Sequence, residues 1–150
     1  MSGTKPITIL IADDDADDRM LIADAFDEAR LSNPVAFVED GVELLQYLRR
    51  EDKYEDLKKQ PLPGLILLDL NMPRMDGRTA LGEIRADDNL KRIPIIILTT
   101  SKSEEDVFRT YNLGVNSFIT KPVTFEGLVD VVQVLSKYWI EIVALPGDTD

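Results

Sequence analysis

The chain has 150 residues, enough for one domain of ordinary size, and its 44% hydrophobic and 30% charged residues are typical of a globular protein. Cysteine and histidine are both absent, which excludes disulfides, thiol nucleophiles, imidazole bases and most transition-metal sites. The net charge of −11 argues against a nucleic acid partner, because phosphate backbones attract clusters of Lys and Arg.

The apolar runs of the sequence are too short for a membrane protein. None approaches the roughly 20 residues that a transmembrane helix needs. The first run, at residues 7–12, is followed at once by Asp13, Asp14 and Asp15, and a signal peptide would not carry three aspartates. We therefore expect a cytoplasmic protein with no membrane partner.

Five segments have the composition of β-strands. Residues 7–12, 65–70 and 95–99 are continuous runs rich in Ile and Leu, as in strands that are covered on both faces. Residues 35–39 and 117–120 are weaker candidates.

Stretches with helical periodicity lie between consecutive strands. The first has one apolar face, formed by Met20, Ala23, Phe26 and Asp27 with Leu21, Ala25 and Ala29. This βα alternation predicts an α/β fold, in which a doubly wound, five-stranded parallel sheet has the order 2-1-3-4-5 and helices on both faces.

Polar residues stand where the predicted strands end. Asp13 and Asp14 follow the first strand, Asp69 lies in the third, Thr99 ends the fourth and Lys121 follows the fifth. Because ligands of such sheets bind at the carboxyl ends of the strands, these residues should lie close together.

Three carboxylates at one edge would repel one another by about 4 kcal/mol per close pair at an effective dielectric constant near 20. A divalent cation relieves this repulsion, and oxygen ligands without imidazole or thiolate select Mg²⁺, with Ca²⁺ and Mn²⁺ as alternatives. We expect Asp14, Asp69 and the main-chain carbonyl of Asn71 to be direct ligands, with Asp13 acting through water.

The same residues suit phosphoryl transfer. The carboxylate of Asp69 is already ionised at neutral pH and can accept a phosphoryl group, while Thr99 and Lys121 bind the phosphoryl oxygens. The donor must be external, either a phosphohistidine on a partner protein or a small acyl phosphate, because the chain has no histidine. Each residue alone could be a turn, capping or strand residue, and only the full set favours a site.

The motifs ILIADDD, ILLDLNMPRMDG, PIIILTT and SFITKPV, between residue 7 and about residue 138, resemble the CheY-like receiver domains of bacterial response regulators. The resemblance implies a flavodoxin/CheY-like fold and a receiver domain at residues 1–138. It further implies that Asp69 is the phosphoacceptor, that Asp13, Asp14, Asp69 and the Asn71 carbonyl hold Mg²⁺, and that Thr99 and Lys121 bind the phosphoryl group.

The resemblance also implies a conformational switch. In the family, phosphorylation draws the hydroxyl at the position of Thr99 inward, and an aromatic residue at the position of Phe118 turns with it. The alternative is that Phe118 is only a core residue.

Two segments narrow the resemblance to the small cyanobacterial response regulators that pair with phytochrome histidine kinases. The connection at residues 48–63, LRREDKYEDLKKQPLP, is long and charged, and we expect it to extend the second helix. The chain also continues past the last helix as YWIEIVALPGDTD. The donor implied is a sensor histidine kinase, specifically a phytochrome.

The last predicted helix, at residues 125–143, has an apolar arc much wider than the roughly 100° that one packed face needs. We expect residues 139–150 to be a C-terminal extension that continues this helix and forms a homodimer, because exposed aromatic residues favour interfaces. The predicted interface consists of Tyr138, Trp139, Ile142, Val143 and Leu145. The alternative is that this segment folds back over its own domain.

The function expected is that of a stand-alone response regulator, which signals by conformational change and protein binding. It would not be an enzyme beyond self-phosphorylation and slow self-dephosphorylation on Asp69. The alternative is a magnesium-dependent aspartyl-phosphate phosphotransferase or phosphatase. Such enzymes usually place a second aspartate two residues after the nucleophile, where this chain has Asn71.

Overall fold

A computed structural model describes residues 7–31, 33–70, 72–99, 117–120, 122 and 124–137. For Thr99, Ser117, Phe118 and Thr120 the description covers the backbone only.

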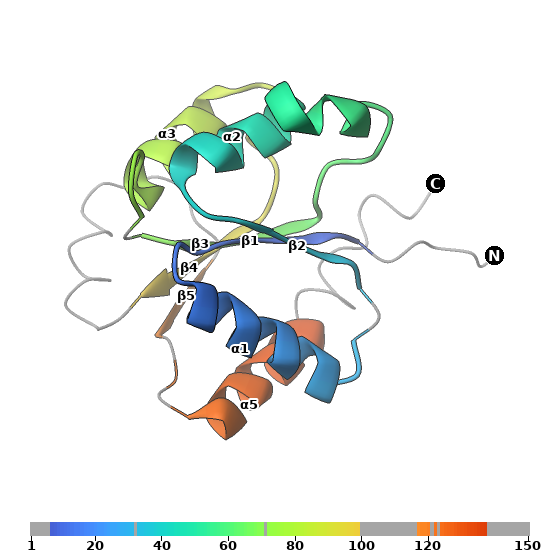
Figure 1. Ribbon diagram of the computed structural model, residues 1–150, viewed down its shortest axis with the longest axis vertical. Coiled ribbons are helices and arrows are strands. Elements are labelled where there is room, and N and C mark those ends of the chain that lie inside the picture. Colours follow the sequence, from blue (N-terminus) through green and yellow to red (C-terminus); the bar gives the residue numbers. More distant parts are fainter. Residues whose placement is uncertain are drawn as a thin grey trace.

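The centre of the domain is a parallel sheet with the strand order β2-β1-β3-β4-β5 (Figure 1). Its strands are β1 (Ile9–Ala12), β2 (Val35–Val38), β3 (Leu65–Asp69), β4 (Ile95–Thr99) and β5 (Ser117–Thr120). The predicted α/β class is confirmed, with a parallel sheet in which β2, β1, β3 and β4 follow one another.

Helices cover both faces of the sheet. They are α1 (Ala16–Glu28), α2 (Gly41–Arg49), α3 (Gly77–Ala86) and α5 (Phe125–Leu135), with a 3₁₀ helix η1 (Asp52–Leu57) after α2. In Figure 1, α2 and α3 lie on one side of the sheet and α1 and α5 on the other. In the part of the chain that the structure describes, no helix is long and apolar enough to span a membrane.

The strands form because their Ile and Leu side chains are buried on both faces. All residues of β1 and β3 are buried, and their side chains divide between two cores. One core contains Leu10, Ile66 and Ile97, and the other contains Ile11, Leu67 and Leu98. Alternation along each strand thus supplies both helical layers.

Acidic residues start three of the helices. The side chains of Asp15, Asp40 and Asp76 accept hydrogen bonds from the main-chain N–H groups of the first turns of α1, α2 and α3, and Thr124 does the same for α5. These caps satisfy N–H groups that have no partner within the helix. Each of these four helices follows a strand in the chain, and its capping residue lies in the loop between the two.

The predicted apolar face of α1 was partly wrong. Ile22, Ala25 and Phe26 are buried, whereas Met20 is 64% exposed and Leu21 44%. Ile22 lies three and four residues from Ala25 and Phe26, which is the spacing of one helix face. Met20 faces solvent, whereas the partly exposed Leu21 lines a cavity beside α5.

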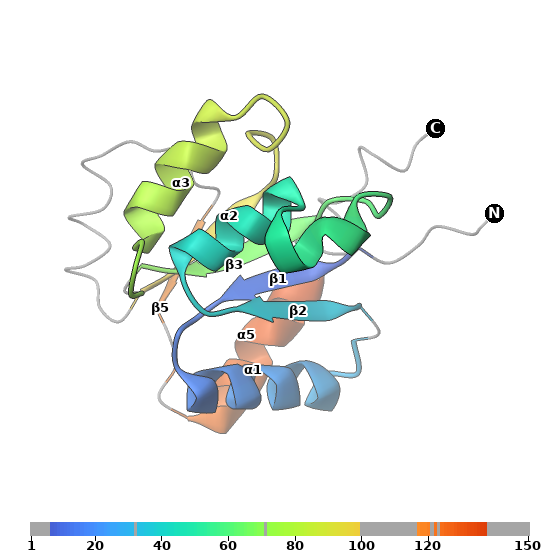
Figure 2. The same cartoon turned by 45° about the horizontal axis from the view of Figure 1, so that its top comes forward.

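The predicted extension of the second helix was wrong. Helix α2 ends at Arg49, and Arg50 adopts a left-handed conformation with φ 57°. Its guanidinium donates hydrogen bonds to the carbonyl oxygens of Tyr47 at 2.8 Å and Pro61 at 2.9 Å. These bonds fold the chain back, and η1 appears as a separate short helical turn beside α2 (Figure 2).

Helix η1 is attached to α2 through one buried carboxylate. Glu43 is 8% exposed and accepts hydrogen bonds from the Tyr54 hydroxyl and from the Glu39 N–H at 2.7 Å. The Lys53 ammonium lies 2.8 Å from the same carboxylate. Burial alone would raise the pKa of Glu43, but the hydrogen bonds from Lys53, Tyr54 and Glu39 together lower it.

We predict that Tyr54→Phe lowers the free energy of unfolding by roughly 1.5–3 kcal/mol at neutral pH, because it removes a hydrogen bond to a buried charge. The pKa of Glu43 is lower in the folded protein than its ordinary value of 4.5. Stabilisation by the ionised form is therefore complete above that value and is lost as the pH falls through the folded pKa. The loss caused by Tyr54→Phe should shrink in the same acidic range, as measured by urea unfolding.

Lys53→Gln is the matched control, because the Lys53 side chain is 67% exposed and water screens its charge. We expect its loss to be smaller than that of Tyr54→Phe. Equal losses in the two variants, or a loss in Tyr54→Phe that does not depend on pH, would contradict the assigned role of Glu43.

Candidate functional site

Three carboxylates meet at the carboxyl edge of the sheet. Asp13 and Asp14 follow β1, Asp69 ends β3, and these strands are neighbours with Ala12 opposite Leu68. Carboxylate oxygens of the three residues lie within 4.8 Å of one another. Asp13 is fully buried, Asp69 is 5% exposed and Asp14 is exposed, so the cluster opens to solvent on the side of Asp14.

Asp13 is held from several directions. Its N–H donates to the Val38 carbonyl at 3.0 Å, and its Oδ1 accepts from the Asp15 N–H at 2.9 Å. Arg19 donates from Nη1 to the Asp13 carbonyl oxygen at 2.7 Å. These contacts fix the turn between β1 and α1, which carries two of the three acids.

The segment after Asp69 approaches it closely at Gly77, the first residue of α3. A Cβ atom at Gly77 would lie 2.6 Å from the Asp69 carbonyl oxygen, so only glycine fits there without a shift of the backbone. The Gly77 N–H also donates to the Leu70 carbonyl at 3.0 Å. The N-terminus of α3 is therefore fixed next to Asp69.

The cluster has the chemistry of a cation site. Like charges at such distances repel one another by about 4 kcal/mol per pair at an effective dielectric constant near 20. Ligands that are all oxygen suit a hard divalent ion such as Mg²⁺, Mn²⁺ or Ca²⁺. The donor set of Asp13, Asp14 and Asp69 therefore fits such an ion.

Other predicted site residues are described only in part. Thr99 is the last residue of β4, one position beyond Leu98, which lies opposite Asp69. In β5 the backbone of Phe118 lies opposite Ile97. Asn71, Lys121 and the predicted interface residues Tyr138, Trp139, Ile142, Val143 and Leu145 lie outside the described residues.

The sequence interpretation missed the role of Arg19. The available signal was a single arginine directly after the acidic stretch from Asp13 to Asp18, placed to reach back over the first helical turn. Its Nη2 also lies 3.9 Å from a Glu39 carboxylate oxygen. One basic side chain thus bridges the loops that follow β1 and β2.

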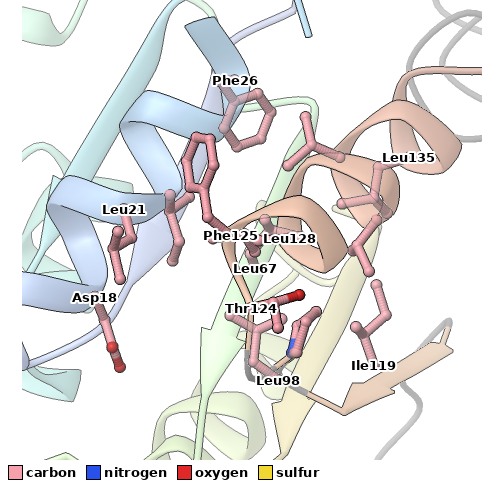
Figure 3. A pocket seen from close by; sticks show the side chains of 14 residues that line it. Asp18, Leu21, Phe26, Leu67, Leu98, Ile119, Thr124, Phe125, Leu128 and Leu135 are labelled. Atoms are coloured by element: carbon pink, nitrogen blue, oxygen red, sulfur yellow. The ribbon is translucent and has the colours of Figure 1, made fainter. Parts of the chain in front are cut away.

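A cavity of about 110 Å³ opens between α1, α5 and the sheet. Figure 3 shows Phe26 of α1 and Leu128 of α5 on its walls, with Leu67 of the sheet behind them. Asp18 and Thr124 are the polar side chains that line it. The other described residues that line it are apolar, so their side chains add no further ligand to this one carboxylate and one hydroxyl. The acidic edge, where three carboxylates meet, remains the candidate site.

Comparison with known proteins places these features in a family. The model of the response regulator receiver domain matches residues 9–133. The response regulator Rcp1 of Synechocystis sp. (strain ATCC 27184 / PCC 6803 / Kazusa) is 38% identical over 142 residues, which make up 95% of each sequence.

Solved structures agree with this similarity. The phosphorylated cyanobacterial phytochrome response regulator RcpA is 39% identical with a TM-score of 0.80, covering 91% of this chain and 96% of that one. Rcp1 with bound Mn²⁺ is 38% identical with a TM-score of 0.80, covering 94% and 99%. The receiver domain of the sensor histidine kinase PA1611 of Pseudomonas aeruginosa PAO1 has magnesium in its active-site cleft. It is 26% identical with a TM-score of 0.66, covering 91% and 98%.

The family match covers nearly all of the described fold, including β1 and β3 with their terminal acids. Relatives bind Mn²⁺ or Mg²⁺, which agrees with the oxygen ligands of the acidic cluster. The chain belongs to the response regulator receiver domain family, whose members work in two-component phosphorelay signalling.

Proposed function

We propose that this protein is a stand-alone, cytoplasmic response regulator that accepts a phosphoryl group on Asp69 from the phosphohistidine of a phytochrome sensor kinase. The observation that carries the proposal is the meeting of Asp69 with Asp13 and Asp14 within 4.8 Å at the sheet edge. A phytochrome as donor is supported by RcpA, a phytochrome response regulator similar over nearly its full length. The protein signals by conformational change and protein binding.

Mg²⁺ is the proposed ion, held by Asp14, Asp69 and the main-chain carbonyl of Asn71, with Asp13 acting through water. The exposure of Asp14 and the burial of Asp13 support this division. When bound, the ion offsets the charge that gathers on the phosphoryl oxygens. Asp13, held by the Asp15 N–H, keeps its carboxylate at the inner wall of the site.

The transfer needs no general base. A carboxylate oxygen of Asp69 attacks phosphorus, the P–N bond to the donor imidazole breaks, and its electron pair remains on the ring nitrogen. Thr99 and Lys121 bind the transferred group. Later attack by water on phosphorus regenerates Asp69 and releases inorganic phosphate. Self-phosphorylation and slow self-dephosphorylation are the only reactions proposed.

The signal passes through Thr99 and Phe118. Thr99 lies in β4 and Phe118 in β5, and these strands are neighbours in the proposed doubly wound order 2-1-3-4-5. A phosphoryl group adds about −1.5 to −2 charges at Asp69, which draws the Thr99 hydroxyl inward and lets Phe118 turn. Residues 1–138 form the receiver domain in which this change occurs.

Residues 139–150 are proposed to continue helix α5 and to form a homodimer through Tyr138, Trp139, Ile142, Val143 and Leu145. The proposal is supported by apolar residues on two different faces of α5. Val132 and Leu135 are buried against the sheet, whereas Val134 is 63% exposed. An apolar residue on the outer face is consistent with a helix that packs on two partners.

We predict that Asp69→Asn abolishes phosphoryl uptake from a phosphorylated histidine kinase, because an amide cannot form the acyl phosphate. Mass spectrometry of the intact protein measures the uptake. Asp76→Asn is the matched control, since asparagine also caps helices and Asp76 caps the adjacent α3. Labelling of Asp69→Asn, or loss of labelling in both variants, would contradict the assignment.

We predict that Asp14→Asn weakens Mg²⁺ binding by at least about tenfold, because it removes one charged ligand from a site that has few. Calorimetric titration measures the dissociation constant. Asp17→Asn is the control, because Asp17 is exposed in the first turn of α1 and donates its N–H to the cap. Equal affinity of the wild-type protein and Asp14→Asn would remove Asp14 from the metal site.

We predict that Trp139→Glu converts the homodimer to monomer in the full-length chain, because the interface would bury an unpaired charge. Sedimentation velocity gives the association state, with Lys137→Glu as the control at an exposed position. An unchanged association state in Trp139→Glu would favour the alternative, in which the segment folds over its own domain.

A further inference from the structure

The described residues 72–76 of the loop between β3 and α3 contact another part of the domain. The Gly77 N–H, at the start of α3, donates to the Leu70 carbonyl at 3.0 Å. Near the end of the loop, the Met75 carbonyl accepts from the Gly41 N–H at 2.9 Å. A Cβ atom at Gly41 would lie 2.4 Å from that carbonyl oxygen. The loop that leaves Asp69 is therefore in direct contact with the start of α2.

Arg74 and Asp40 add a side-chain contact at the same place. Arg74 donates from Nε to Asp40 Oδ2 at 2.9 Å and from Nη2 to Oδ1 at 3.1 Å. Nη2 also lies 2.8 Å from Oδ2. Contacts from two guanidinium nitrogens to one carboxylate fix the orientation of both groups. Asp40 is 7% exposed and also caps α2 by accepting from the Glu43 N–H at 2.8 Å. The bond from the Glu43 N–H therefore holds the Asp40 carboxylate in place independently of Arg74.

The backbone of Arg74 is also unusual. Its φ of 62° is in the left-handed region, which is unfavourable for residues other than glycine and, to a lesser degree, asparagine and aspartate. Such a conformation persists when surrounding contacts determine it. Here the Arg74 guanidinium contacts Asp40, and the Met75 N–H donates to the Pro73 carbonyl at 2.6 Å across the turn.

We propose that the Arg74–Asp40 ion pair positions the loop after the phosphoacceptor and thereby sets the rate of phosphoryl transfer to Asp69. Arg74 is a positioning residue, because it acts through the loop backbone and not on the phosphoryl group. The inference rests on the proposed function, since it concerns chemistry at Asp69. It adds a residue pair that lies 34 positions apart in the sequence and outside the acidic cluster.

The rate of phosphoryl transfer depends on the alignment of the reacting groups. Misplacement by about 1 Å can slow a reaction by up to roughly a hundredfold. The loop that carries Arg74 leads from β3 to Gly77, where an added Cβ atom would lie 2.6 Å from the Asp69 carbonyl oxygen. A shift of this loop would therefore move the main chain on the carboxyl side of Asp69.

The test measures the rate of phosphorylation by acetyl phosphate at saturating Mg²⁺ in full-length protein, over a range of donor concentrations. Arg74→Asn removes the guanidinium and leaves a residue that tolerates the left-handed backbone. Asp40→Asn keeps the helix cap but loses the charge. Both variants should lower the maximal rate by about tenfold, without an equal change in the half-saturating donor concentration. The double variant should be no slower than either single variant.

Two further variants separate positioning from charge. Arg74→Lys keeps the positive charge but cannot donate from two nitrogens at once, so it should be slow like Arg74→Asn. Arg78→Asn, which removes a nearby guanidinium that lies 3.9 Å from Asp76, should react at the wild-type rate. A wild-type rate in Arg74→Lys would overturn the proposal, because charge alone would then suffice.

The failure of this inference can be told apart from the failure of the proposed function. Normal labelling of the wild-type protein, with unchanged maximal rates in Arg74→Asn and Asp40→Asn, overturns the positioning role alone, even if the variants melt at lower temperature. Absence of labelling in the wild-type protein overturns the proposed function and this inference with it.

Discussion

Parallel strand pairing brings three carboxylates to one edge of this domain. Their mutual repulsion is the constraint that the surrounding contacts must offset. Neighbouring strands β1 and β3 end in Asp13, Asp14 and Asp69, and two of these acids are buried. Burial weakens the screening by water, so the cluster costs folding free energy unless positive charge and N–H groups surround it. The Asp15 N–H donates to the Asp13 carboxylate, and Arg19 brings a positive charge to the Asp13 main-chain carbonyl, so both contribute to this need within the fold. A divalent cation would meet it from outside.

Three of the chain's acidic residues, Asp15, Asp40 and Asp76, cap helices that follow β1, β2 and β3. The N-termini of three helices therefore gather where the phosphoryl group is proposed to bind, and helix N-termini favour anions. Asp40 also anchors Arg74, so a single acid links helix capping to the loop after Asp69.

The strands could be predicted from the sequence because apolar runs mark them directly. The acidic cluster could be predicted because the carboxyl ends of parallel strands lie at one edge of the sheet. Runs of Ile and Leu marked β1, β3 and β4, and the edge rule for parallel sheets brought their terminal acids together. Other features had no such signal. Arg50 ends α2 in a left-handed conformation where glycine would have been expected. The Arg74–Asp40 contact joins loops that only the folded chain places side by side.

The most direct test of this account is the effect of Mg²⁺ on stability, compared between the wild-type protein and Asp69→Asn. An ion that binds only the folded state, at roughly 100 times its dissociation constant, should raise the free energy of unfolding of the wild-type protein by about 2.7 kcal/mol. The increase should be much smaller in Asp69→Asn, because a charged ligand is missing. Equal stabilisation of the two proteins, or no effect of Mg²⁺ on either, would contradict a metal site built on Asp69.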